Sequence, residues 1–175
     1  MIPNEKIKLW TIKDKKEEKF LRRKTEVFDF KKHGKEDIRK LLERMKKVMK
    51  LANGIGLSAN QIGFTYRIFI AQVPAENGGY KFYAIFNPEI EKPSKEKMLF
   101  EEGCLSIPGM YGSVNRPDKV TLNGFDKNGR ALKIKAWGLL ARVFQHEVDH
   151  LNGYLFIDRT KVLHGVETPS GTSQK

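Results

Sequence analysis

The sequence contains little cysteine and no long apolar run. Of its 175 residues only Cys104 is a cysteine, which excludes an intramolecular disulfide framework and fits a reducing compartment. No apolar stretch approaches the roughly 20 residues that a membrane-spanning helix needs. The composition, with 39% hydrophobic residues, is typical of a globular protein. We therefore expect residues 1–175 to form a single domain with its own core, in which the small, polar residues 168–175 are a flexible tail.

Recognisable leader segments are also missing from the sequence. Up to Phe30 there is no apolar core of the kind that a signal peptide has, and acidic residues such as Glu17 and Glu18 argue against a transit peptide. We expect a cytoplasmic protein. The alternative is an organellar protein whose leader has been removed.

Positive charge is in excess and unevenly distributed. The net charge is +12, and residues 1–50 hold 18 Lys or Arg against 9 Asp or Glu. The simpler interpretation is a set of solvated helix faces rich in lysine. The alternative is a basic face that contacts RNA or another polyanion. We expect neither a membrane nor DNA as a partner.

Hydrophobic periodicity predicts one long helix and two hairpins. From Lys35 to Ala52 apolar residues recur every three or four positions, which indicates an amphipathic helix. Runs of β-branched and aromatic residues around turn sequences indicate pairs of strands. The expected pairs are 66–73 with 81–87, joined by Glu76–Gly79, and 120–122 with 132–134.

The middle and the end of the chain complete an α+β fold. A further strand is expected at residues 98–100, whereas the prolines and glycines of residues 103–118 predict an irregular loop. Gly138 begins a helix with apolar residues on more than one side, and Asn152–Gly153 ends it. This helix should be central, with antiparallel or mixed sheets packed on both of its flanks.

The central helix carries the motif His146-Glu147-Val148-Asp149-His150. Because four residues make slightly more than one helical turn, His146 and His150 lie on one face and can bind one metal ion. Glu147 points beside them, where it can act as general base on a water at that ion. An ordinary helix with two buried histidines is the alternative, but three such residues in fixed register favour a metal site.

A catalytic site of this kind needs a third protein ligand. Two protease classes supply it downstream of the motif, but Phe156 stands where one class has histidine, and Glu167 lies near the expected tail. His164 has the same weakness, and we expect His33 to be a surface residue. Cys104 remains. Alone it would more often be a buried thiol without a role, but with two histidines it would complete a Cys-His-His site suited to softer ions.

Three segments resemble the motifs of the peptide deformylase family. They are Gly54–Gln61, Glu102–Ser106 and Gln145–His150, in the same order and at similar spacing, and the resemblance covers the chain from about residue 20 to residue 157. Two features depart from the commonest pattern. Ser58 stands where alanine is usual, which we expect to matter little to the chemistry. The long basic C-terminal helix by which some bacterial members dock on the ribosome is not found, so docking by that route is not expected.

The resemblance implies an activity, a cofactor and the residues that hold it. The enzyme would remove the formyl group from newly synthesised polypeptides that begin with N-formyl-methionine, releasing formate. Cys104, His146 and His150 would hold one divalent metal ion, which is iron(II) natively in this family, with zinc or nickel as substitutes. Glu147 would be the acid/base. Apart from this nascent peptide, the excess of positive charge in the N-terminal half, and not the resemblance, leaves weak association with the ribosome open as a second contact.

The resemblance also implies how the substrate is bound. The side-chain amide of Gln61 and the backbone N–H of Leu105 would stabilise the carbonyl oxygen as negative charge develops on it. Gly54, Ile55 and Gly56 would present an edge to which the peptide adds as a strand. The methionine side chain would need an apolar pocket, for which the candidates are Ile55, Phe100, Leu105, Val143 and the ring of His146.

Two other functions stay open at this point, together with one structural expectation. A zinc endopeptidase would cleave internal peptide bonds, although its downstream ligand is missing. A basic RNA- or ribosome-binding module would hold a purely structural metal, and its binding to polyanions would weaken steeply with salt. Asp149 and Arg116 are expected to pair and to steady the metal site.

Overall fold

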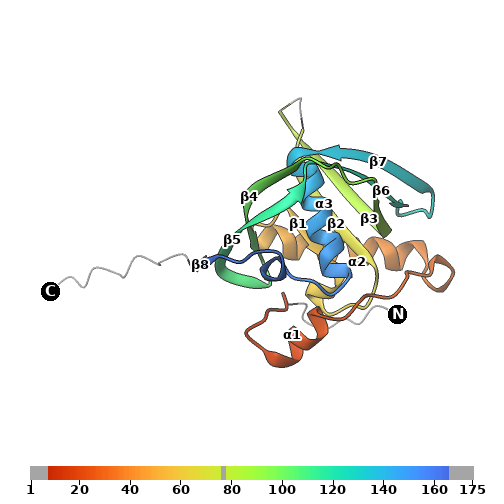
Figure 1. Ribbon diagram of the computed structural model, residues 1–175. Coiled ribbons are helices and arrows are strands. Elements are labelled where there is room, and N and C mark those ends of the chain that lie inside the picture. Colours follow the sequence, from red (N-terminus) through yellow and green to blue (C-terminus); the bar gives the residue numbers. More distant parts are fainter. Residues whose placement is uncertain (1–7, 76–77, 166–175) are drawn as a thin grey trace.

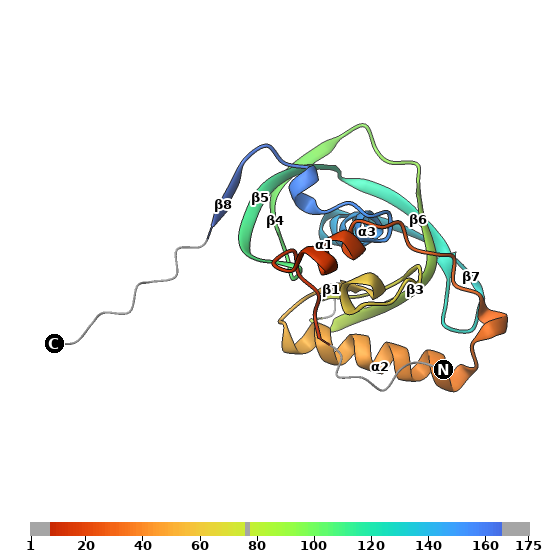
Figure 2. The same ribbon diagram turned by 90° about the horizontal axis from the view of Figure 1, so that it is seen from below.

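The computed structural model describes residues 8–75 and 78–165, which have an α+β fold (Figure 1). Their strands form two antiparallel sheets, one of five strands and one of three. Helix α3 (Gly138–Leu151) lies at the centre, with strands of both sheets around it (Figure 2). The predicted class is confirmed. The expected tail at 168–175 and the hairpin residues Glu76 and Asn77 lie outside the described residues.

The central position of α3 follows from its apolar residues. Phe144 is fully buried, and its ring lies 5.6 Å from that of Phe69 and 5.3 Å from that of Tyr83, centroid to centroid. The helix also contacts the three-stranded sheet on its other side. Gly153 follows its last turn with φ +82, where a β-carbon would overlap the carbonyl of Arg22. The predicted start, end and two-sided packing of this helix are therefore confirmed.

Helix α2 (Lys35–Leu51) is the predicted amphipathic helix. Its buried face covers the five-stranded sheet, as Figure 2 shows. The buried residues of that face are Ile38, Leu41, Leu42, Met45 and Met49. Its exposed face carries the ion pairs of Arg39 with Glu36 and Glu43. Burial of the apolar stripe, rather than helix propensity alone, therefore stabilises α2.

The five-stranded sheet contains both predicted hairpins. Its order is β1-β2-β3-β6-β7, so that β1 and β7 are its edges. The strands are β1 (Gly56–Ser58), β2 (Ile68–Pro74), β3 (Tyr80–Glu91), β6 (Lys119–Phe125) and β7 (Ala131–Trp137). Among the described residues β1 pairs only with β2, so its other edge has no strand partner.

The three-stranded sheet corrects one prediction. Residues 103–118 are not an irregular loop, because most of them form β5 (Ile107–Pro117), which pairs with β4 (Lys97–Cys104) and β8 (Leu163–Gly165). The prolines lie next to or at the strand ends, where a ladder tolerates them. Gly112 lies where a β-carbon would come within 2.9 Å of Thr160 and of the backbone oxygen of Val162. The glycine thus permits close strand packing instead of marking a turn.

The N-terminal segment packs against the site rather than standing apart from it. Before α1 (Lys15–Leu21), Trp10 N donates to Gln61 O at 2.7 Å and Ile12 N donates to Ser106 O at 3.0 Å. Short 3-10 helices lie at Phe30–Lys32, Ala59–Ile62 and Phe156–Asp158. None of the described helices is long and apolar enough to cross a membrane. Through its hydrogen bonds to Gln61 and Ser106, the N-terminal segment before α1 links the first and second sequence motifs.

Candidate active site and metal centre

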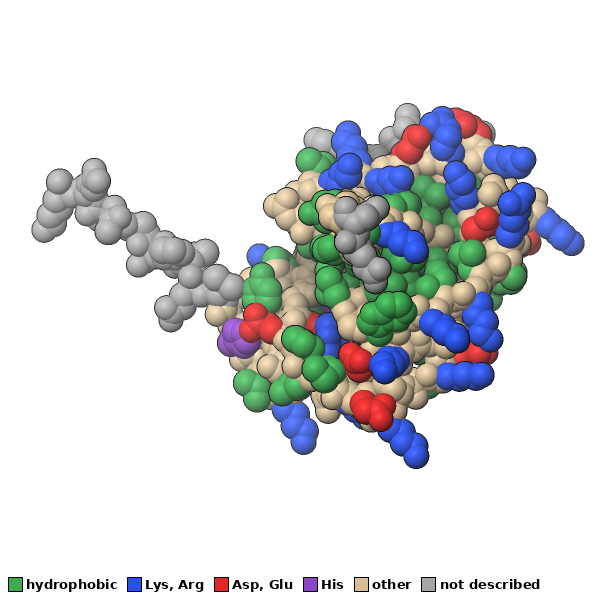
Figure 3. Space-filling view, turned by 90° about the horizontal axis from the view of Figure 1, so that it is seen from above, with side chains coloured by type: hydrophobic (Ala, Val, Ile, Leu, Met, Phe, Trp, Pro, Cys, Tyr) green, Lys and Arg blue, Asp and Glu red, His purple; other side chains and the backbone are tan. Residues whose placement is uncertain are grey.

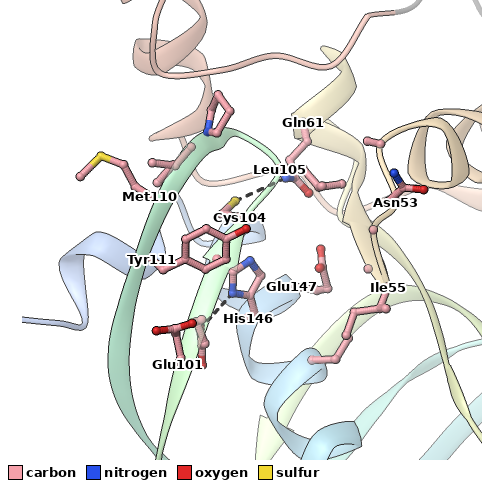
Figure 4. A pocket seen from close by; sticks show the side chains of 18 of the residues that line it. Asn53, Ile55, Gln61, Glu101, Cys104, Leu105, Met110, Tyr111, His146 and Glu147 are labelled. Carbon is pink, nitrogen blue, oxygen red and sulfur yellow. Dashed lines mark hydrogen bonds and ion pairs between the residues drawn. The ribbon is translucent and has the colours of Figure 1, made fainter. Parts of the chain in front are cut away.

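A pocket of about 620 Å³ lies beside the free edge of β1. The last residues of β4 form its opposite wall, and α3 contributes further lining residues (Figure 4). All three sequence motifs contribute residues to its lining, among them Gly56, Cys104 and His146. Segments about 40 residues apart in the chain thus meet at one cavity.

The predicted ligands converge at this pocket. The ligand atoms of Cys104, His146 and His150 all lie within 4.8 Å of one another. Cys104 Sγ is 3.1 Å from His150 Nε2, and the two imidazole rings are 4.9 Å apart, centroid to centroid. Helical spacing brings the histidines together, and a register shift after Gly103 turns the end of β4 toward them.

This donor set fits a metal ion. One thiolate and two imidazoles are ligands that zinc and other borderline-soft divalent ions accept. His146 Nδ1 lies 3.1 Å from Glu102 Oε2, an arrangement that fixes the ring and leaves Nε2 to face Cys104. His150 is almost fully buried, and its Nδ1 has no partner among the described residues. The nitrogens that face the site are therefore Nε2 of His146 and Nε2 of His150, the latter 3.1 Å from Cys104 Sγ.

The two histidines respond oppositely to their surroundings when no ion is bound. Burial alone would lower the pKa of His146, but hydrogen bonds with Cys104 and Glu102 outweigh it and raise the pKa to about 10. Burial lowers the pKa of His150 well below its ordinary value, and the charge on His146 adds to this effect. A proton on His146 would have to leave before a metal ion could bind there, because ion and proton compete for the same lone pair.

Glu102 connects the histidine to two arginines. Arg116 Nε donates to Glu102 Oε1 at 2.7 Å and Arg142 Nη1 donates to the same oxygen at 2.6 Å. Burial alone would raise the pKa of Glu102, but hydrogen bonds from His146 and Arg116 lower it to about 2. Arg116 Nη1 also donates to Asp149 Oδ2 at 2.7 Å, which confirms the predicted pair.

Glu102 and Arg142 were not predicted as parts of this network. Their spacing could have revealed both. Glu102 is two residues before Cys104 on a strand, and Arg142 is four residues before His146 on a helix, so each faces the same way as a ligand. Arg142 also donates to the backbone oxygens of Val114 at 3.0 Å and Met98 at 2.6 Å.

Glu147 lies at the wall of the pocket with only 3% of its surface exposed. Burial raises its pKa to about 7, although the charge on His146 and the hydrogen bond from Ser58 act in the opposite direction. Ser58 Oγ lies 2.7 Å from Glu147 Oε2. A carboxyl group with this pKa can both accept and return a proton near neutral pH.

Gln61 presents its amide N–H group to the same site. Ser58 N donates to Gln61 Oε1 at 2.8 Å, which fixes the orientation of the amide. Its Nε2 therefore faces Ser106 Oγ at 3.1 Å and Cys104 Sγ at 3.8 Å. Leu105 lines the pocket beside it and lies so close to Gly54 that a β-carbon there would meet Leu105 Cδ1 at 2.6 Å.

The other predicted substrate contacts divide into two groups. Gly54, Ile55, Gly56 and Val143 line the pocket. Phe100 does not, because its ring lies over the guanidinium of Arg142, 5.1 Å from centroid to Cζ.

Several residues of the pocket lining were not predicted. Tyr111 and Leu139 also line the cavity, and Tyr111 packs over Gly103, where a β-carbon would come within 2.7 Å of its ring. Interpreting residues 103–118 as a loop concealed Tyr111, because a loop gives no indication of which side chains face a cavity.

The remaining histidines lie apart from the trio. His164 was expected to lie in a flexible segment, but it lies in β8, which pairs with β5. Its Nε2 is 2.7 Å from Glu101 Oε2. His33 is half-buried rather than a simple surface residue, and its ring stacks on Phe28 at 4.7 Å. Neither belongs to the group of potential ligands found among the described residues.

Comparison with protein families gives a match over most of the chain. A family model described as Polypeptide deformylase matches residues 10–165. The chain is 44% identical over 124 residues to the peptide deformylase of Treponema pallidum (strain Nichols), which covers 71% of this chain and 74% of that relative. It is 43% identical over 126 residues to the peptide deformylase of Picosynechococcus sp., which covers 72% of this chain and 67% of that relative.

Solved structures with the same fold agree with these matches. A probable peptide deformylase from Synechococcus phage S-SSM7 is 39% identical, with a TM-score of 0.79 over 88% of this chain and 99% of that one. Peptide deformylase from Thermotoga maritima is 31% identical, with a TM-score of 0.78 over 91% of this chain and 100% of that one.

Proposed function

The chain belongs to the polypeptide deformylase family, and from that premise we propose how its own residues carry out the family's reaction. It is a metal-dependent hydrolase that removes the N-formyl group from the N-terminal formyl-methionine of newly synthesised polypeptides and releases formate. One observation carries the assignment of roles. Cys104, His146 and His150 converge within 4.8 Å at a pocket that Glu147 also lines.

Cys104, His146 and His150 are the proposed ligands of one divalent ion. Iron(II) is the proposed native ion and zinc or nickel its substitutes, since a thiolate with two imidazoles suits all three. When bound, the ion lowers the pKa of a coordinated water toward ~7 and so supplies a nucleophile at neutral pH. Glu102, held by Arg116 and Arg142, would keep the His146 ring in its binding orientation.

Glu147 is the proposed acid/base. Its carboxylate lines the pocket next to His146, so it can take a proton from the attacking water and later give it to the leaving amine. Both steps need a group that gains and loses a proton without a large free-energy cost. A pKa of about 7 meets this requirement.

Gln61 and Leu105 are the proposed donors to the developing oxyanion. The orientation of the Gln61 amide is already fixed by Ser58 N, so no reorganisation is needed when charge appears on the formyl oxygen. Leu105 would donate through its backbone N–H, from the residue directly after the ligand Cys104.

The proposed peptide site is the free edge of β1. Gly54, Ile55 and Gly56 line the pocket there, and an extended peptide can add to an unpaired strand edge through main-chain hydrogen bonds. Val143, Leu105 and the ring of His146 offer an apolar surface for the methionine side chain. Phe100 would contribute only indirectly, through the position of Arg142.

We propose that the described residues act as one catalytic domain, because the pocket takes its lining from both sheets and from α3. A cytoplasmic location is proposed, with an organellar location as the alternative. Figure 3 shows a face on which Lys and Arg side chains surround a central group of hydrophobic ones. Weak association with the ribosome through the basic N-terminal half is proposed because residues 1–50 hold 18 Lys or Arg against 9 Asp or Glu, and it should weaken as salt is raised.

The test of the reaction is formate release from an N-formyl-methionyl peptide. The protein is loaded with iron(II) without oxygen, and Glu147→Ala is measured beside the wild type at equal metal content. Formate from the wild type and its loss in the variant would support the proposed role of Glu147. Equal rates would remove Glu147 from the mechanism, and cleavage of an internal peptide bond without formate release would revive the endopeptidase.

A further inference from the structure

Strand β1 turns two of its three residues toward α3. Side chains alternate along a strand, so Gly56 and Ser58 face one way and Leu57 faces the other. Leu57 packs in the apolar cluster that contains α2 residues. Gly56 and Ser58 instead meet Glu147, and Ser58 is fully buried there. A buried hydroxyl therefore lies directly against the proposed acid/base.

The hydroxyl of Ser58 has two acceptors within reach, and both belong to Glu147. Oγ is 2.7 Å from the carboxylate oxygen Oε2 and 3.0 Å from the backbone oxygen. A hydroxyl has a single proton to donate. The backbone oxygen lies inside α3, where helix carbonyls already accept from the helix itself. When Glu147 is ionised, its carboxylate is the stronger acceptor, so the proton of Ser58 is then donated mainly to Oε2.

Gly56 holds the carboxylate from the other side. A β-carbon at Gly56 would overlap Glu147 Oε1, so the carboxylate packs directly on the backbone of β1. One oxygen is thus bound by Ser58 and the other rests against Gly56. Ser58 N also donates to Gln61 Oε1, so one residue contacts both the proposed proton carrier and a proposed oxyanion donor.

We propose that Ser58 is a positioning residue for the reaction, whose hydroxyl holds the Glu147 carboxylate against Gly56 in the orientation that faces the substrate. The inference rests on the proposed role of Glu147 and goes beyond it. It also revises the expectation that serine in place of the usual alanine matters little, because that expectation did not include a contact with the acid/base.

The test compares Ser58→Ala with the wild type at known metal content. We expect kcat per bound metal to fall about tenfold, the size of effect expected when one hydrogen bond to a charged group is lost. KM and metal content should stay within about twofold, since removing one hydroxyl leaves the ligands and the strand edge in place. An unchanged kcat per bound metal, or a change in KM alone, would overturn the proposal.

Thr25→Val is the matched control. Thr25 Oγ1 is also a buried hydroxyl that donates to α3, at 2.9 Å to the backbone oxygen of Leu151, but it does not touch Glu147. Its loss should lower the melting temperature without changing kcat per bound metal. If both variants lost kcat equally, the effect would reflect the stability of α3 and the proposal would fail.

Two further variants separate the possible failures. Glu147→Gln tests the underlying role: activity retained in it would overturn the role of Glu147 itself, whereas activity lost in it but kept in Ser58→Ala would overturn only the role of Ser58. Ser58→Thr retains the hydroxyl and should keep kcat within about threefold of the wild type. A folded, metal-loaded threonine variant with the tenfold loss would contradict the proposal even if Ser58→Ala failed to fold.

Discussion

Two buried carboxyl groups close to the three proposed ligands have pKa values that are shifted in opposite directions. Glu102 faces Arg116 and Arg142, and its pKa of about 2 keeps it ionised as the partner of His146. Glu147 lies against Gly56 and Ser58 with no arginine bonded to it among the described residues, and burial raises its pKa to about 7. Neighbouring side chains, rather than residue type, thus separate an orienting group from a proton carrier.

The proposed role of the Gln61 amide as an oxyanion donor can be tested by a single substitution. In Gln61→Ala we expect kcat to fall about a hundredfold, or ~3 kcal/mol, the usual cost of losing one side-chain donor to an oxyanion. Metal content should not change, because Gln61 is not among the proposed ligands. The measurement is formate release at saturating substrate, with bound metal determined on the same samples.

The control for Gln61 is Gln72→Ala. Gln72 lies on β2 and does not line the pocket, so the same chemical change there should leave kcat within about twofold. A Gln61→Ala variant as active as this control would remove the amide from the oxyanion site and leave the Leu105 N–H as the proposed donor.

At the scale of elements, α3 connects the metal site to the three-stranded sheet. Arg142 lies one turn before His146 and donates to backbone oxygens of β4 and β5, as well as to Glu102. Its side chain is almost buried. The same helix face therefore carries the ligands and the contact that holds the opposite pocket wall in place.

Loss of this contact should destabilise the protein. In Arg142→Met the methionine side chain fills the space of the aliphatic part of arginine. The backbone oxygens of Met98 and Val114, however, lose a charged hydrogen-bond donor. We expect the free energy of unfolding to fall by about 2–3 kcal/mol, as for loss of a buried hydrogen-bonded charge. Chemical denaturation measures it.

Arg39→Met on α2 is the matched control for Arg142. Arg39 also pairs with carboxylates, those of Glu36 and Glu43, but its side chain is 56% exposed. Exposed ion pairs contribute little, so the unfolding midpoint should hardly move. Equal losses in the two variants would show that Arg142 does not stabilise the packing of α3 on the sheet.

At the scale of the whole molecule, one ion would join parts that are distant in the chain. Its proposed ligands come from β4 and α3, which belong to different layers, and the N-terminal segment is bonded to Gln61 and Ser106 beside them. Binding to the folded state alone stabilises a protein by mass action. The ion should therefore affect the stability of the entire fold as well as its activity.

Metal removal tests this coupling. At free metal about 100 times its Kd, the added stability is ~2.7 kcal/mol, which corresponds to a rise in melting temperature of roughly 5–10 °C for a protein of this size. We expect zinc or nickel to restore this rise in chelator-treated protein. Cys104→Ala should lose the response, and His164→Ala, outside the trio, should keep it. A response retained in Cys104→Ala would place the ion elsewhere.

Helices α2 and α3, both hairpins and the three proposed metal ligands could all be predicted from the sequence. Helical and strand periodicity are local properties, because a side chain's face depends only on its position along its own element. The spacing of His146 and His150 is local in the same sense. The prediction of Cys104 as a ligand depended in addition on the rule that a catalytic site with two histidines requires a third protein ligand.

Which residues surround the proposed ligands and the acid/base depends on the tertiary structure. Strand β5 was concealed because Gly112 is explained by Thr160, Val162 and Leu163, which are distant in the chain and come beside it only after folding. The bond of Ser58 to Glu147 joins residues 89 positions apart, and that of Arg142 to Glu102 joins residues 40 positions apart. Such contacts depend on how the two sheets and α3 pack together, and this packing cannot be predicted from the periodicity of residues along the chain.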